Sequence, residues 1–142
     1  MKQPTLIRFA LGYIAIASAQ IGFWALFAPR SFYDSFPGMG RAWVSLDGPY
    51  NEHLVRDVGA LNLAFLALIV FAAVRLTREL VTVAAVATAV WSVPHLIYHL
   101  FNTDDLATSD IVISLAGLVG YVAFAGVLLA SARSLRDRPE RA

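Results

Sequence analysis

Two histidines in the second half of the chain have a spacing that suits metal or ligand binding on a helix. His95 and His99 are four residues apart, so on an α-helix their imidazoles lie one turn apart on the same face. Such a pair can bind a divalent metal when further side chains complete the site. The candidates for these further ligands are Glu52, His53, Asp57 and Asp104. The sequence has no HExxH motif, so a zinc-protease centre is not predicted.

Aromatic and polar side chains extend the histidine pair into a stripe. On a helix its members fall within about 100° of one another; they are Trp91, His95, Tyr98, His99 and Asn102. We expect the stripe to face other helices, because lipid would leave its hydrogen bonds unmade. Three interpretations remain open: a metal site, a site for a ligand, a quinone or a proton relay, and a structural polar network.

Other segments carry polar residues that we expect at the same end of the protein. Glu52 and Arg56 are four residues apart and can form an ion pair, either as part of a site or simply as a charged helix start at the membrane surface. Together with the stripe, these residues predict an outward-facing polar pocket. Its further candidates are Gln20, Trp24, Glu52, His53, Arg56, Asp57, Asn62, Asp110 and Ser114.

Four long apolar segments must position these side chains. Helices are predicted at about residues 5–28, 54–75, 79–101 and 108–132, each near the 20 residues that cross a bilayer. The chain is 58% hydrophobic and 15% charged, with a mean hydropathy of +0.65, which is far from the balance of a soluble domain. We therefore predict an all-α integral membrane four-helix bundle, with antiparallel up-down topology, as a single domain over residues 1–142.

Further features set the boundaries and exclude some chemistry. The absence of cysteine excludes disulfides, iron–sulfur clusters and thiol catalysis. Ala17-Ser18-Ala19 resembles a signal-peptidase site, but the apolar run continues beyond it, so we expect the first span to be retained. Pro49 is expected to begin the second long helix, and Asn102 or Thr103 to cap the fourth.

The positive charges predict an orientation. With both termini in the cytoplasm, eight of the 11 Lys and Arg residues lie inside, and the positive-inside rule then holds. The inside residues are Lys2, Arg8, Arg75, Arg78, Arg133, Arg136, Arg138 and Arg141, and the outside residues are Arg30, Arg41 and Arg56. The arginines otherwise form no basic stripe, so nucleic-acid binding is not predicted.

The long outer loop, residues 29–52, is unusually aromatic. It contains Phe32, Tyr33, Phe36, Trp43 and Tyr50. Aromatic side chains are enriched at the level of the lipid headgroups, so the loop could form an aromatic belt. It could instead form a lid over the outward-facing pocket.

Short motifs give the chain a resemblance to a known group. Ile7–Gly12 opens the first span, Pro29 closes it, and His53–Gly59 opens the second. In these residues and in its four spans the chain resembles the DoxX-like group of small bacterial membrane proteins. The resemblance implies a four-helix bundle in the bacterial cytoplasmic membrane and, for some members, quinone-linked oxidation. The histidine pair has no counterpart in these motifs, so the resemblance assigns no catalytic residue.

These observations favour an accessory membrane protein whose outer pocket binds a small apolar ligand or a partner membrane subunit. One alternative is a quinone-linked oxidoreductase subunit, with His95, Tyr98 and His99 near the quinone headgroup. The other is a metal-dependent membrane enzyme that uses His95 and His99, with a divalent metal as cofactor.

Overall fold

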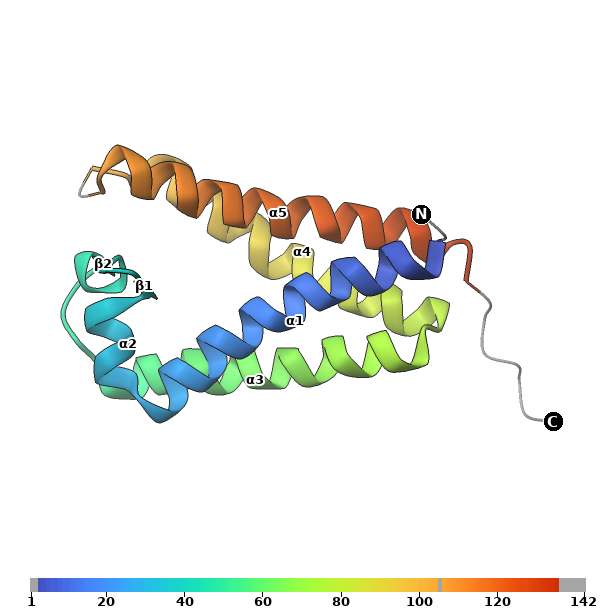
Figure 1. Cartoon of the computed structure of the whole chain (residues 1–142), viewed down its shortest axis with the longest axis horizontal. Coiled ribbons are helices and arrows are strands. Elements are labelled where there is room, and N and C mark those ends of the chain that lie inside the picture. The colour runs from blue at the N-terminus through green and yellow to red at the C-terminus, as the bar shows by residue number, and fades with distance from the viewer. Residues whose placement is uncertain (1–2, 105, 136–142) are drawn as a thin grey trace. The chain divides into compact units, whose positions relative to one another are not determined.

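The protein is mostly helical, with a short segment of small elements between the first two long helices (Figure 1). The structure, a computed structural model, describes residues 3–104 and 106–135. The long helices are α1 (Gln3–Phe27), α3 (Glu52–Arg75), α4 (Arg78–Phe101) and α5 (Thr108–Ala132). Between α1 and α3 lie α2 (Pro29–Ser35), β1 (Pro37–Gly38), β2 (Arg41–Ala42) and the 3₁₀ turn η1 (Val44–Leu46). The all-α prediction is confirmed, and the four long helices occupy the predicted apolar segments. Several charges used to predict orientation lie outside the described residues, namely Lys2, Arg136, Arg138 and Arg141.

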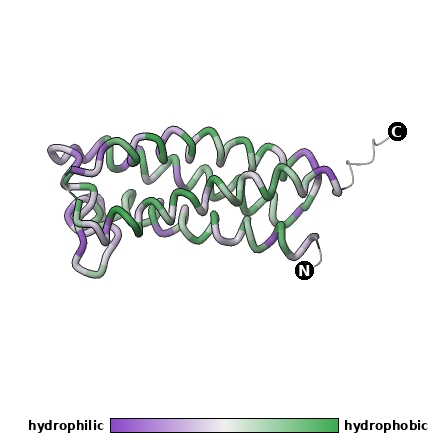
Figure 2. The backbone as a smooth tube through the Cα atoms, turned by 90° about the horizontal axis from the view of Figure 1, so that it is seen from above, coloured by the Kyte–Doolittle hydropathy of each residue, from purple (hydrophilic) through white to green (hydrophobic). Residues whose placement is uncertain are grey.

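The long helices keep most of their apolar surface outside the protein. Among the described residues, four helices are long and apolar enough to cross a membrane. In the most apolar part of α3, only 17% of the residues are buried inside the protein; in the most apolar part of α1, the share is 33%. Hydrophobic residues predominate along these helices in Figure 2. A soluble protein rarely exposes so much contiguous apolar surface, so these helices indicate a multi-pass membrane protein.

The chain divides into two compact units, each described by itself. The first comprises Met1–Ile14 and Leu68–Ala142, so it holds the start of α1, the end of α3, and the α4–α5 pair. Thr77 is the N-cap of α4, and its hydroxyl accepts a hydrogen bond from the Leu80 amide at 3.4 Å. The buried stripe of α4 consists mainly of small side chains, which let a neighbouring helix approach closely; it comprises Val81, Ala84, Ala85, Thr88 and Ser92.

The second unit is Ala15–Ala67, which joins the end of α1 to the start of α3. The segment between the helices, residues 29–50, is folded rather than irregular, and we call it the cap. The core of this unit is formed by Ala25 of α1, Phe32 of the cap and Val55 of α3. Aromatic rings extend this core, with Phe32 4.8 Å from Phe36 and 5.9 Å from Trp24 between ring centroids. The cap is therefore attached to the last turns of α1 by packing as well as by the chain.

Two predicted helix starts are wrong. Helix α3 begins at Glu52 and not at Pro49. The Asn51 side chain accepts a hydrogen bond from the Leu54 amide at 3.1 Å and so caps the helix at this point. Helix α5 is preceded by Ala107, with no side-chain cap. Asn102 instead ends α4, five residues before Ala107, and its amide group donates to the Tyr98 carbonyl at 2.8 Å.

Candidate ligand-binding site on α4

The aromatic and histidine side chains of α4 form a continuous row of ring contacts. The Trp91 and His95 rings are stacked, with centroids 5.0 Å apart and planes 18° apart. His95 contacts His99 edge-on at 4.8 Å, and His99 contacts Tyr98 at 5.5 Å. We call these four residues the ring row. The prediction that they lie on a shared part of α4 agrees with this geometry.

A residue of α5 that was not among the pocket candidates extends the row. The Tyr121 ring lies 5.0 Å from Trp91 and 5.7 Å from Tyr13 of α1. Tyr13 in turn donates a long hydrogen bond of 3.4 Å to the Gly117 carbonyl. The signal for Tyr121 was its position seven residues after Ser114, which places both on one face of α5.

The ring row is less buried than the sequence predicted. His95 and His99 are half-buried, whereas Trp91 and Tyr98 are 36% and 48% exposed. The reason is the direction of the buried stripe of α4, which passes through Ser92 at 0% exposure. Trp91 is one residue away, about 100° around the helix, so it lies at the edge of this stripe. The row thus has one buried side and one accessible side.

Two polar atoms on the buried side have no hydrogen-bond partner among the residues that the structure describes. They are Nδ1 of His99 and the hydroxyl oxygen of Ser92. A buried polar atom without a partner costs about 1–3 kcal/mol, so such atoms are uncommon in structural networks. A neutral imidazole has one donor and one acceptor nitrogen, which suits a ligand with polar groups on an apolar body.

The remaining candidates of the first unit make local contacts. Ser114 is 8% exposed and donates to the Ile111 carbonyl at 3.0 Å. Asp110 lies half-buried in the first turn of α5. Within residues 3–104 and 106–135, no group of three His, Cys, Asp or Glu side chains lies close enough together to hold a metal ion.

In the second unit, Arg56 connects two helices. Its guanidinium contacts the Glu52 carboxylate at 2.8 Å and also donates to the carbonyl of Leu26. Leu26 lies in the last turn of α1, where carbonyl groups lack helical partners, so Arg56 acts as a C-terminal cap for that helix. His53 and Asp57 form a second pair at 3.4 Å, and both are exposed.

The other candidates of the second unit are engaged locally. The Trp24 indole N–H donates to the Ser31 hydroxyl at 3.1 Å. The Asn62 amide group donates to the Val58 carbonyl at 2.9 Å, and Gln20 is exposed. The structure therefore brings together the candidates of α4 in one row and those of α3 in one charged turn, each within its own unit.

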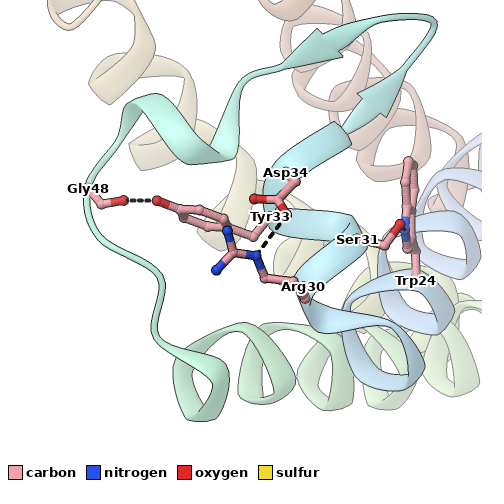
Figure 3. Close-up of polar contacts among 6 residues, drawn as sticks. All are labelled: Trp24, Arg30, Ser31, Tyr33, Asp34 and Gly48. Carbon is pink, nitrogen blue, oxygen red and sulfur yellow. Dashed lines mark hydrogen bonds and ion pairs between the residues drawn. The ribbon is translucent and has the colours of Figure 1, made fainter.

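Polar contacts also fix the cap (Figure 3). Arg30 pairs with Asp34 at 2.7 Å, and the Tyr33 hydroxyl donates to the Gly48 carbonyl at 2.6 Å. The hydrogen bond that Arg30 donates to the Asp34 carboxylate raises the pKa of Arg30 above its usual value. Desolvation raises the pKa of the Tyr50 phenol, and the negative charge of Glu52 raises it further. Both side chains thus keep their ordinary charge at neutral pH.

Comparison of the chain with protein-family models, with curated proteins and with solved structures gave no match. The functional interpretation therefore depends on the residues themselves. The part that combines stacking surfaces, hydrogen-bonding nitrogens and access from outside is the ring row.

Proposed function

We propose that this chain is a multi-pass membrane protein that binds a planar, membrane-soluble ligand at the ring row. The observation that carries the proposal is the stacked and edge-on series of Trp91, His95, His99 and Tyr98. Aromatic surfaces bind flat apolar bodies, and imidazole nitrogens orient the few polar groups that such a ligand carries. The imidazoles of His95 and His99 are half-buried, so each can present a ring nitrogen to a ligand at the row.

The ligand class that fits best is a ring with hydrogen-bond acceptors, such as a quinone headgroup. A quinone is flat, so it can stack on an aromatic side chain, and its carbonyl oxygens accept hydrogen bonds from imidazole N–H groups. This choice agrees with the proposed relation to the DoxX-like group of bacterial membrane proteins. The ring row alone supports binding, and the accompanying redox function is the second candidate.

A binding measurement tests this proposal. In a Trp24→Phe/Trp43→Phe background, Trp91 is the remaining tryptophan, because the chain has three. Adding a water-soluble short-chain ubiquinone should quench Trp91 saturably, and His99→Leu should raise the Kd at least about tenfold, or about 1.4 kcal/mol. Leu100→Ala, at an exposed position of the same helix, should leave the Kd unchanged. Quenching that does not saturate, or that is equal in all variants, would contradict binding at the row.

We further propose that both termini are cytoplasmic, which puts the His99 end of α4 and the cap on the outer side. The support is the distribution of Lys and Arg. Asp47 is exposed in the cap, and Glu79 is exposed in the first turn of α4. A membrane-impermeant thiol reagent added to intact cells should label Asp47→Cys and not Glu79→Cys. Labelling of Glu79→Cys alone would reverse the orientation.

A further inference from the structure

The hairpin of the cap ends in an unusual turn. Strands β1 and β2 are antiparallel, with Gly38 paired to Arg41, so Met39 and Gly40 form a two-residue loop. Their φ angles are 56° and 78°, both in the left-handed region, as in a type I′ turn. Such turns favour Asn, Asp or Gly, because a larger side chain is disfavoured at positive φ.

Met39 departs from that preference and is also the most exposed large hydrophobic side chain that the structure describes. Its exposed fraction is 89%. Within the second unit, neither the local conformation nor packing among the described residues explains a methionine at this position. A residue kept in an unfavourable conformation with its side chain outside the fold indicates an interaction beyond the chain.

The base of the hairpin holds the tip in place. The Trp43 amide donates to the Phe36 carbonyl at 2.8 Å, and the two rings are 6.1 Å apart. Phe36 also contacts Trp24 of α1 at 6.2 Å. The tip is thus positioned relative to the end of α1, within one compact unit.

The position of the cap between two span-length helices indicates what surrounds the Met39 side chain. The cap begins at Pro29, two residues after α1 ends, and its last residue, Tyr50, is two residues before α3 begins. Both ends are therefore attached to apolar, span-length helices. At the end of α1, Phe23 and Phe27 are stacked and exposed, as expected for side chains in lipid. A folded segment held between two such helix ends lies at the membrane surface, where flexible apolar side chains insert below the headgroups.

We propose that the hairpin tip inserts Met39 into the headgroup–acyl boundary of the membrane that α1 and α3 cross. This seats the cap on the bilayer, independently of any ligand at the ring row. The partner is the lipid of the same membrane, and a protein covering the tip is the competing explanation that the experiment must separate.

Single cysteines test the insertion directly, since the natural chain has none. Met39→Cys and the matched control Asp47→Cys, both in the cap, are labelled with an NBD fluorophore in phosphatidylcholine–phosphatidylglycerol nanodiscs. We expect lipids spin-labelled near the headgroup to quench position 39 and aqueous iodide to quench position 47. Quenching of position 39 by iodide as strongly as position 47 would overturn the proposal. Protection of position 39 from both quenchers would also overturn it, in favour of a protein partner.

A second measurement avoids the bulky fluorophore. A small cationic thiosulfonate should react with Met39→Cys at least tenfold more slowly than with Asp47→Cys in nanodiscs. The two rates should become equal after complete denaturation. Equal rates in nanodiscs would show that water reaches the tip, and the proposal would fail.

Discussion

Replacing Phe32 by alanine should destabilise the second unit by about 3–5 kcal/mol, the cost of removing a buried aromatic side chain. Phe32 is 5% exposed and contacts both Trp24 and Phe36. It belongs to α2, the α-helix of the cap, and it connects the cap to the end of α1 through Trp24. Its loss leaves a cavity between α2 and the end of α1.

The measurement is equilibrium unfolding in mixed micelles as the denaturing detergent is increased. Intrinsic fluorescence reports on the cap because Trp24 and Trp43 both belong to its aromatic cluster. Phe27→Ala is the matched control, since Phe27 lies in the same unit and is 70% exposed. The control should cost less than about 1 kcal/mol. Equal losses in the two variants would show that the cap is not packed as described.

Replacing Gly59 by alanine should also destabilise the protein, by about 1–3 kcal/mol. A methyl group at this position would overlap the backbone amide of Leu26 and lie 2.8 Å from its Cα atom. Backbone atoms cannot rotate away as a side chain can, so α1 and α3 would have to separate. That movement would also lengthen the hydrogen bond from Arg56 to the Leu26 carbonyl.

Gly126 of α5 provides the comparison for Gly59. A methyl group there would meet nothing within 4 Å, so Gly126→Ala should keep or slightly raise stability through its better helix propensity. Thermal unfolding in detergent should therefore separate the two substitutions. If Gly59→Ala is as stable as Gly126→Ala, the close approach of the helices at Leu26 is wrong.

The long helices could be predicted because their signal is local. Each apolar run is long enough to be identified as a spanning helix from its own residues. The predicted bounds of α5, residues 108–132, agree with the structure. The helix starts were less predictable. Pro49 is a good first residue of a helix by type, but the bond between Asn51 and the Leu54 amide begins α3 later.

The folded cap could not be predicted from local patterns. Its elements are short: α2 has seven residues, and each strand has two. Hydrophobic periodicity needs longer windows to identify an element. The aromatic content showed that the segment is unusual, but the contacts from Trp24 to Phe32 and Phe36 depend on how α2 folds back onto α1.

The ring contacts along α4 could be predicted from the sequence, whereas the exposure of these rings could not. Helical spacing alone places His95 one turn from both Trp91 and His99, as the ring contacts show. Which side of the row is buried depends on the neighbouring helices, which sequence spacing does not identify. Arg56 illustrates the same limit, because its partner Leu26 is 30 residues earlier in the chain.

Native mass spectrometry of the protein, released from lipid nanodiscs made directly from cell membranes, tests the central claim most directly. The protein with intact His95 and His99 should retain a small molecule that is not a phospholipid. The double variant His95→Ala/His99→Ala should lose it, while the folded control Gly126→Ala should retain it. The same bound mass in the double variant, or no such mass in any of the three proteins, would contradict a ligand site at the ring row.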